Sequence, residues 1–428
     1  MNKSIRYSIA ILWLCIMAPV LEGFAQASPE KTATGVSIIN RSINYERLKK
    51  IDSMVNHHIK EGWANGVVTM IMKDGQVVQH KAYGYADLEN KKPMAYNSLF
   101  RLMSQTKAIT SIGMMMLYEE GKFQLEQPIS DFIPEFKKPV ILDQYNPKDS
   151  SYTTKPAKRE INFVDLFTHT SGLSYPDIGE NKMKAIYAKA GIPSGLGSIH
   201  ASLEDKMKAL GKLPLLHNPG EQHTYGINTD LLGYLIEKIS GSTLEAFLTS
   251  RLFKPLGMND TYFNVPQSKA DRLTAVYTED ASKKVVRWGS AFRNIDPNYP
   301  IIPTTYFSGG AGLTSTAKDY GLFLQMILNK GTYNGHQFLS PRTVEMILTN
   351  QTDPPVTFSH GIAFEITSKE KARRQPLSEG SFSWGGYLGT NYWADPKYNL
   401  VCLFMIQQTP NSHPMPKKFQ QLVYQSLK

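Results

Sequence analysis

The sequence predicts an α+β fold, in which an antiparallel sheet is flanked by helices and interrupted by an inserted, mostly helical region. Two observations support this prediction. Runs rich in β-forming residues lie near both ends of the chain, and helical periodicity dominates between them. No repeat or low-complexity linker divides the chain. We therefore expect one unit over residues 28–428, with its α/β part at about 40–100 and 300–428 and the helical insertion at about 101–299.

The first elements are a helix and a hairpin. Apolar residues recur every three or four positions between Asn44 and Lys60, which predicts an amphipathic helix. Val67–Met72 and Gln76–Tyr83 read as strands. The Asp74-Gly75 pair between them supplies the positive φ angles that a tight hairpin needs.

The central and final elements follow the same two patterns. Apolar faces that include Ile109 and Leu231 predict two central helices. Late in the chain, Phe382–Trp393 and Leu400–Gln407 read as strands, and a helix over about 417–427 ends the sequence. Strands from both ends would complete one sheet, and the cleft between this sheet and the helical insertion is the expected site for a small molecule.

Composition excludes several classes of protein. Of the 428 residues, 41% are hydrophobic, which allows a large buried core and excludes a disordered or collagen-like chain. Cys15 and Cys402 are the only cysteines, so a disulfide scaffold and a cysteine-rich metal site are excluded. The formal charge of +10 is spread along the chain. We expect no nucleic-acid partner, and an anionic cell-wall polymer is a candidate partner.

The first 27 residues have the pattern of a secretory signal peptide. Lys3 and Arg6 precede an apolar stretch, and Ala25-Gln26-Ala27 offers the small-x-small pattern that signal peptidase accepts. A permanent membrane anchor is the alternative, but the apolar stretch is shorter than the roughly 20 residues that span a bilayer. We expect an exported protein, periplasmic or secreted, with no membrane association after cleavage.

Common catalytic motifs are absent from the sequence. The ten histidines are scattered and form no H-E-x-x-H, so we expect no metal. There is no G-x-S-x-G, Walker loop or dinucleotide fingerprint, so we expect no cofactor.

Four Ser-x-x-Lys tetrads remain, and three residues on a helix bring a lysine amine within reach of a serine hydroxyl. The tetrads begin at Ser28, Ser104, Ser315 and Ser368. Ser28 lies at the expected new terminus, and Ser368 lies in a charged segment. Ser104 and Ser315 each lie just before a segment with the apolar spacing of a helix, so both are candidates for the nucleophile. Ser315 reads equally well as an ordinary helix N-cap, and the apolar residues before Ser104 favour that serine.

Five blocks, in order, resemble the serine β-lactamase and penicillin-binding-protein superfamily, specifically the class C β-lactamase-like group that includes family VIII carboxylesterases. The resemblance extends from about residue 45 to 410 and implies a β-lactamase-like fold. The blocks are Phe100–Lys107, Ile161–Leu173, Pro219–Gly241, Ser308–Tyr320 and Trp384–Gly386.

The resemblance also implies the roles of individual residues. Ser104 would be the acylated nucleophile, Lys107 its activating amine, and Tyr225 the phenol that shares proton transfer with the lysine. A serine hydroxyl needs such a base to become an effective nucleophile. The backbone N–H groups of Ser104 and Tyr387 would form the oxyanion hole. The segment Trp384-Gly385-Gly386 would contact substrate.

Two departures from the pattern bear on the substrate. β-Lactamases carry Lys-Thr-Gly where this chain has Trp384-Gly385-Gly386, so a cation and a hydroxyl that hold the β-lactam carboxylate are absent there. The usual Tyr-x-Asn is replaced by Tyr225-Gly226-Ile227-Asn228. We therefore expect Asn228 to cap the following helix, and His169 to be structural.

The expected function is an exported serine hydrolase that cleaves esters through an acyl-Ser104 intermediate. One alternative is a D-amino-acid peptidase or weak β-lactamase acting on cell-wall fragments, with a small amide as substrate. A third reading is a non-catalytic envelope-binding or sensor module of the same fold.

Overall fold

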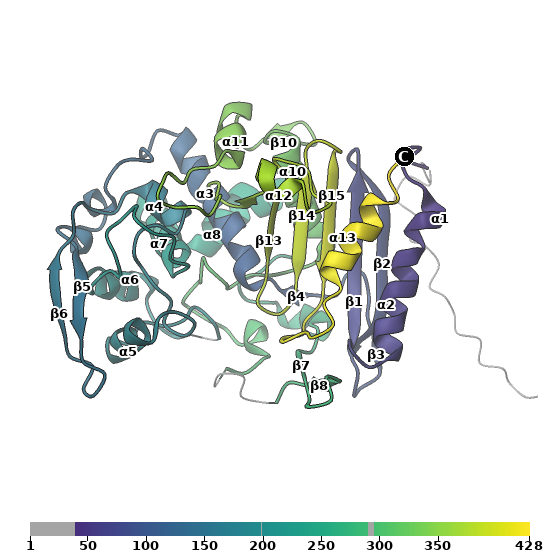
Figure 1. Cartoon of the computed structure of the whole chain (residues 1–428), viewed down its shortest axis with the longest axis horizontal. Helices are drawn as coiled ribbons and strands as arrows, with labels where there is room; N and C mark the ends of the chain where they lie inside the picture. Colours follow the sequence, from purple (N-terminus) through teal and green to yellow (C-terminus); the bar gives the residue numbers. More distant parts are fainter. Residues whose placement is uncertain (1–38, 198, 290–294) are drawn as a thin grey trace, which may run out of the picture. The chain divides into compact units, whose positions relative to one another are not determined.

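A computed structural model describes residues 39–197, 199–289 and 295–428. Residues Asn40–Lys428 form one compact unit (Figure 1). The expected signal peptide at residues 1–27 and the tetrad that begins at Ser28 lie outside the described residues. Within those residues, no helix is both long and apolar enough to cross a membrane.

A seven-stranded sheet is the main architectural feature, and its order is β12-β13-β14-β15-β1-β2-β3. Every neighbouring pair is antiparallel. The strands are β1 (Gly66–Lys73), β2 (Gln76–Asp87), β3 (Lys92–Pro93), β12 (Glu365–Ile366), β13 (Phe382–Gly385), β14 (Asn391–Asp395) and β15 (Leu400–Met405). The N-terminal hairpin joins the C-terminal strands where β1 pairs with β15, with Val68 opposite Met405. This confirms the predicted fold class.

Alternating side chains of the central strands pack on two different layers. Val67 and Ile71 of β1 belong to one buried cluster, together with residues of α2 (Lys50–Lys60) and α13 (Pro416–Tyr424). Val68 and Met70 belong to the other and larger cluster, which includes residues of α10 (Ala317–Leu328). Because both faces are covered, these strands read as continuous apolar runs in the sequence.

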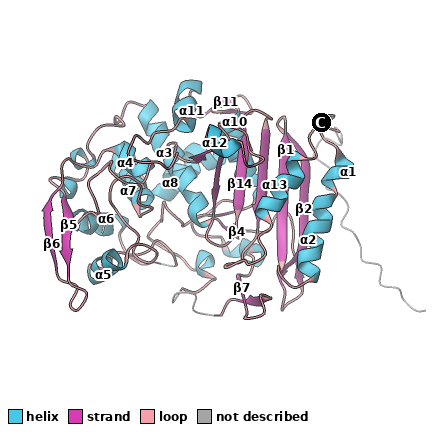
Figure 2. Cartoon of the chain, viewed as in Figure 1, coloured by secondary structure: helices cyan, strands magenta, loops and turns pink. Residues whose placement is uncertain are grey.

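The region between the two groups of strands is mostly helical (Figure 2). Its central pair is α3 (Thr106–Glu119) and α7 (Asn228–Ser240), which pack on each other. Around them lie α4 (Phe163–Phe167), α5 (Asn181–Lys189), α6 (Leu203–Gly211), α8 (Leu244–Leu248) and α9 (Lys254–Leu256). The insertion also holds two hairpins, β5 (Val140–Tyr145) with β6 (Tyr152–Pro156) and β7 (Tyr277–Glu279) with β8 (Val285–Arg287).

The remaining short elements lie around the sheet and the insertion. They are α1 (Tyr45–Leu48), β4 (Phe100–Arg101), β9 (Thr314–Ser315), β10 (Thr332–Tyr333), β11 (His336–Gln337), α11 (Pro341–Leu348) and α12 (Lys369–Ala372). Strand β4 lies just before the predicted nucleophile Ser104, where the chain enters the helical region, and it pairs with β9.

One predicted strand is wrong. The run Phe382–Trp393 is two strands, β13 and β14, which pair with each other around a tight turn. The turn closes with a hydrogen bond from the Gly389 N–H to the Gly386 carbonyl at 2.9 Å, and Gly389 has a φ of 93°. Glycine adopts that conformation without steric cost, so an apparently continuous apolar run reverses direction there.

Candidate active site

Ser104 lies in a 3₁₀ turn, η1 (Met103–Gln105), directly before α3. The residues ahead of it are fixed by β4, in which Arg101 pairs with Thr314, and by a hydrogen bond from the Leu102 N–H to the Leu313 carbonyl at 2.9 Å. Met103 has a φ of 51°, which is costly for a residue other than glycine. This sharp turn leaves Ser104 partly exposed at the start of an otherwise buried helix.

Tyr225 reaches Ser104 from a different part of the chain. Its hydroxyl donates a hydrogen bond to Ser104 Oγ at 2.7 Å. The Thr224 N–H bonds the His169 carbonyl at 2.7 Å, and the His169 ring lies 4.8 Å from the Tyr225 ring. The turn that contains His169 therefore holds the phenol against the serine.

Lys107 lies behind these two residues and is buried. Its Nζ donates hydrogen bonds to the Tyr175 hydroxyl and to the Gly310 carbonyl, both at 2.8 Å. It also lies 4.8 Å from the centre of the Tyr225 ring. The three residues predicted from the sequence are thus brought together, but the lysine is bonded to a second tyrosine.

Tyr175 and Asp230 are two members of this cluster that the sequence analysis missed. Burial raises the pKa of the Tyr175 hydroxyl well above its ordinary value, and the nearby charge of Tyr225 and Asp230 acts in the same direction. Burial raises the pKa of Asp230 to about 6, although Ser308 and Lys107 lower it. Neither residue stood out among the many tyrosines and acidic residues of the sequence.

Gly310 fixes how closely these groups approach one another. A Cβ at Gly310 would lie 2.6 Å from Asp230 Oδ2, 3.0 Å from the Tyr175 hydroxyl and 3.5 Å from Lys107 Nζ. The phenol, the amine and the carboxylate therefore surround one residue whose missing side chain leaves them room.

The segment after β13 passes directly against the nucleophile segment. A Cβ at Gly386 would lie 2.5 Å from the Leu102 carbonyl oxygen and would also clash with the Thr390 hydroxyl. Glycine is therefore required for this approach, which places the residues after it beside η1. The predicted oxyanion donor Tyr387 follows immediately, and its side chain is exposed.

Trp384 and Gly385 lie at the end of β13 and are partly exposed. The Trp384 ring is 6.0 Å from the Tyr225 ring and 5.3 Å from the His360 ring. The segment Trp384–Gly386 therefore places an aromatic wall next to the phenol, where Lys-Thr-Gly would supply a cation.

The fold and this geometry agree with the comparisons to known proteins. The model of the family described as Beta-lactamase matches residues 51–425. The chain belongs to the Beta-lactamase family. It is thus a serine hydrolase of the β-lactamase and penicillin-binding-protein superfamily.

Relatives in this superfamily include proteins named for ester and for amide chemistry. The chain is 27% identical to Esterase EstB of Burkholderia gladioli over 369 residues, which cover 83% of this chain and 89% of the esterase. It is 28% identical to an N-acetylmuramyl-L-alanine amidase of Bacillus subtilis over 422 residues, which cover 93% of this chain and 89% of the amidase.

A solved structure shows the same fold. It is EstCE1, described as a hydrolase with promiscuous acyltransferase activity. The TM-score is 0.75 at 24% identity, and the alignment covers 89% of this chain and 99% of that one.

In this member of the Beta-lactamase family, Asn228 does not cap a helix, and that prediction was wrong. Asn228 is the first residue of α7, and its side chain is turned inward. Its Oδ1 accepts a hydrogen bond from the Ser171 hydroxyl, and its Nδ2 lies 2.9 Å from His169 Nδ1. Burial lowers the pKa of His169 well below its ordinary value, so the ring is neutral. The neutral His169 and Asn228 together hold the turn that positions Tyr225.

The serines of the other described Ser-x-x-Lys tetrads have partners outside this cluster. Ser315 is buried in β9 with its hydroxyl 2.7 Å from that of Thr261, and the cap of α10 is its neighbour Thr316. Ser368 caps the short helix α12, and Lys371 pairs with Glu365 at 2.6 Å. In the part of the chain that the structure describes, no group of three or more histidine, cysteine, aspartate or glutamate side chains could hold a metal.

Proposed function

We propose that this protein is an exported hydrolase that cleaves carboxylic esters through a covalent acyl intermediate on Ser104. The observation that carries the proposal is the 2.7 Å hydrogen bond between the Tyr225 hydroxyl and Ser104 Oγ, in front of the buried amine of Lys107. A base in contact with the serine is the requirement for nucleophilic catalysis.

In the first step, Tyr225 acts in its deprotonated form, and the phenolate oxygen accepts the Ser104 proton as Oγ attacks the ester carbonyl carbon. The ammonium group of Lys107, 4.8 Å from the ring centre, stabilises this phenolate before it takes the proton and again after it gives the proton to the alcohol. The N–H groups of Ser104 and Tyr387 receive the carbonyl oxygen as it becomes negative. The tetrahedral intermediate then expels the alcohol, which leaves with the proton held by Tyr225.

In the second step, water attacks the acyl carbon of the acyl-Ser104 ester. Tyr225 accepts a proton from this water and returns it to Ser104 Oγ when the bond to the acyl group breaks. The products are the free acid and the original enzyme, so protons and atoms balance over one cycle.

The residues at the end of β13, beside the site, favour esters over β-lactams as substrates. Residues 384–386 are Trp-Gly-Gly and carry neither an ammonium group nor a hydroxyl for a substrate carboxylate. An aromatic wall next to the phenol suits neutral acyl and alcohol groups instead.

The decisive experiment is labelling and turnover with matched serine variants. Wild-type protein should hydrolyse p-nitrophenyl butyrate and gain one phosphonyl group at Ser104 with an alkyl fluorophosphonate. Ser104→Ala should lose both properties, whereas Ser315→Ala should keep both, since the Ser315 hydroxyl lies 2.7 Å from that of Thr261 and is not bonded to Ser104, Lys107 or Tyr225. Turnover by Ser104→Ala equal to wild type would refute the proposal.

The choice of substrate class needs a direct comparison. We expect kcat/KM for p-nitrophenyl butyrate to exceed that for nitrocefin and for a D-alanyl-D-alanine peptide. If either of these is cleaved faster than the ester, the protein is a β-lactamase or a D-amino-acid peptidase.

Export is the second part of the proposal, and it rests on the residues at the start of the chain. Lys3, Arg6 and the Ala25-Gln26-Ala27 pattern predict cleavage before Ser28. Recovery of a protein that begins at Ser28 from the periplasm or medium would support it, and full-length protein in the cytoplasm would contradict it. Cleavage before Ser28 removes Lys3, Arg6 and Glu22, so the exported chain would carry a charge of +9 and would meet anionic cell-wall polymer. Co-sedimentation with purified cell walls tests that contact.

A further inference from the structure

The outer surfaces of helices α2 and α13 carry an excess of positive charge. The two helices come from opposite ends of the chain and pack side by side on one face of the sheet (Figure 1). Residues 41–60 and 411–427, which include these helices, contain seven lysine and arginine residues against two acidic ones. They therefore hold +5 of the formal charge of +10 in less than a tenth of the chain. Folding gathers charge that is separated in the sequence.

Six exposed cations form this surface, and we call them the basic face. They are Arg47, Lys49, Lys50, Lys60, Lys417 and Lys418. The first four lie along α1 and α2, which continue one another because Lys49 between them has helical dihedral angles. At a rise of about 1.5 Å per residue, the segment from Arg47 to Lys60 is about 20 Å long. The basic face is therefore an extended stripe and not a compact pocket.

Contacts at both ends align α13 antiparallel to α2. At one end, the Arg47 guanidinium donates a hydrogen bond to the Gln425 carbonyl at 3.0 Å. At the other end, burial lowers the pKa of His58, and the positive charge of Lys418 acts in the same direction. Lys418 at the start of α13 thus lies near the end of α2. The lysines of the two helices belong to one charged surface.

The carboxylates of these segments leave four lysines of the basic face without a counter-charge. Glu46 pairs with Lys49 at 2.8 Å, and Asp52 pairs with Lys81 of β2 at 2.7 Å. Both acidic groups are thus already occupied. In the part of the chain that the structure describes, four side chains of the basic face make no ion pair or hydrogen bond, namely Lys50, Lys60, Lys417 and Lys418. These four charges are available to a partner.

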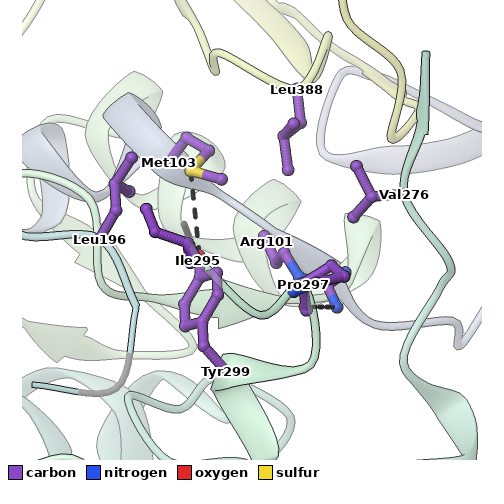
Figure 3. Close-up of a pocket in the computed structure, with 8 residues that line it drawn as sticks. All are labelled: Arg101, Met103, Leu196, Val276, Ile295, Pro297, Tyr299 and Leu388. Carbon is purple, nitrogen blue, oxygen red and sulfur yellow. Dashed lines mark hydrogen bonds between the residues drawn. The ribbon is translucent and has the colours of Figure 1, made fainter. Parts of the chain in front are cut away.

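A buried cation of the chain shows the opposite situation. Arg101 lines the small pocket in Figure 3, and its guanidinium donates hydrogen bonds at 2.8 Å to the carbonyls of Pro297 and Thr274. The protein itself satisfies these donors, so that pocket offers no free cation. The basic face, in contrast, presents amines that the described residues leave unpaired.

The basic face is on the side of the sheet opposite to the catalytic residues. Helices α2 and α13 pack in the buried cluster that includes Val67 of β1. Helix α3 and Tyr225 pack in the other cluster, which includes Val68. Because Val67 and Val68 point to opposite faces of the strand, a partner on the basic face leaves Ser104 free for substrate.

We propose that the basic face binds a linear anionic polymer of the cell wall. An exposed lysine gains little from a single anion, because water and salt screen the pair. Several lysines along a stripe gain much more from a chain that carries many anions, since each contact makes the next one intramolecular. A polymer with repeated phosphate or carboxylate groups has this property, and a small anion does not. The inference rests on the proposed export, which brings the protein to the wall, and not on ester hydrolysis.

The salt dependence of polymer binding is the property to measure. Purified wild-type protein should bind purified cell walls and long-chain polyphosphate, which serves as a linear anionic probe. At about 0.7 released counterions per contact on a single-stranded polyanion, four lysines predict a slope of about −3 for log affinity against log salt. Affinity should then fall by about 50-fold between about 50 and 200 mM salt.

Charge variants with a matched control locate the contact. The test variant combines Lys50→Gln, Lys60→Gln, Lys417→Gln and Lys418→Gln. At low salt it should bind polyphosphate at least about tenfold more weakly than wild type, with a slope closer to zero. The control makes the same change at four exposed lysines of the helical insertion, Lys122, Lys137, Lys148 and Lys254. It should bind within about twofold of wild type, because it loses the same charge outside the basic face.

Two double variants keep the test valid if the fourfold variant does not fold. They are Lys50→Gln with Lys60→Gln, and Lys417→Gln with Lys418→Gln. Each should lose about half of the salt slope, since each removes two of the four contacts. Melting temperatures close to that of wild type would show that the weaker binding does not come from unfolding.

Three results would overturn the basic face as a polymer site. The first is no binding of wild type to polyphosphate or cell walls at low salt. The second is an equal loss in the test and control variants, which would mean that only net charge acts. The third is tighter binding to phosphatidylglycerol vesicles than to cell walls, which would assign this surface to a membrane.

Failure of the proposed function gives a different result. Wild type that binds polymer but cleaves no ester would refute ester hydrolysis and leave the basic face intact. Full-length protein confined to the cytoplasm would refute export, and the cell-wall partner with it.

Discussion

The amine of Lys107 donates a hydrogen bond to the hydroxyl of Tyr175 at 2.8 Å. Tyr225, in contrast, bonds Ser104. The two phenols around this lysine therefore have different partners. Tyr225 contacts the Ser104 hydroxyl, and Tyr175 holds the amine of Lys107 in place.

Tyr175→Phe tests this positioning role. The variant removes the acceptor of a hydrogen bond from a charged group, which is worth about 1.5–3 kcal/mol, so kcat should fall about tenfold or more with little change in KM. Tyr187→Phe is the matched control, because Tyr187 is also fully buried but its hydroxyl accepts a bond from the Ser174 N–H at 3.2 Å. Equal losses in the two variants would mean that Tyr175 has only a packing role.

Tyr225→Phe tests the proton-transfer role. Loss of a general base typically costs about 10²–10⁴-fold in rate, and we expect kcat for p-nitrophenyl butyrate to fall by that amount. Because Tyr225 is only partly buried, the melting temperature should change little. A variant that keeps more than half of the wild-type kcat would show that another group accepts the Ser104 proton.

Gly386→Ala tests the approach of the strand to the nucleophile segment. The added Cβ would lie 2.5 Å from the Leu102 carbonyl oxygen, so the segment must move away and carry the Tyr387 N–H with it. Loss of one oxyanion donor costs about 10²–10³ in kcat. Gly289→Ala is the control, since a Cβ there meets nothing within 4 Å. Full activity in Gly386→Ala would exclude this N–H from the oxyanion hole.

Asp230→Asn tests the buried carboxylate through the pH dependence of stability. Burial raises the pKa of Asp230 from 3.8 to about 6 in the folded protein. A raised pKa means that the folded state holds the proton more tightly, so this stabilisation is complete below pH 3.8 and is lost as pH rises through 6. Relative to Asp230→Asn, wild type should therefore lose up to about 3 kcal/mol of unfolding free energy between pH 4 and pH 7.

The measurement is urea unfolding of both proteins at each pH. Comparison across pH cancels any constant cost of introducing asparagine. Asp205→Asn removes an exposed carboxylate on α6 and controls for the substitution itself. A constant difference between wild type and Asp230→Asn over this range would contradict a raised pKa.

The parts of the molecule that the sequence predicts are those encoded by local patterns. The hairpin at Asp74-Gly75 and the terminal helix near Lys417 follow from turn chemistry and apolar spacing, and the structure contains both. The ordered motif blocks point to Ser104 and Tyr225, which are 121 residues apart, and the structure brings them into contact.

The parts that the sequence does not predict depend on contacts between distant segments. The bond between Lys107 and Tyr175 joins residues 68 positions apart, and no periodicity marks Tyr175 among the 22 tyrosines. Asn228 looks like a helix cap because it lies at the start of a helix. In the structure its side chain is instead hydrogen-bonded to Ser171 and His169, which belong to another turn. The run Phe382–Trp393 does not reveal the break between β13 and β14, because the turn at Gly389 lies inside it and depends on the backbone conformation of that glycine.

The pairing of β1 with β15 has a consequence for how the protein is made. Val68 lies opposite Met405, so the centre of the sheet joins residues from nearly opposite ends of the polypeptide. A nascent chain cannot close this sheet until synthesis has passed residue 405, and contacts of such large sequence separation form slowly. The growing polypeptide therefore lacks its central strand β15 for most of translation, a period in which chaperones have access to the incomplete sheet.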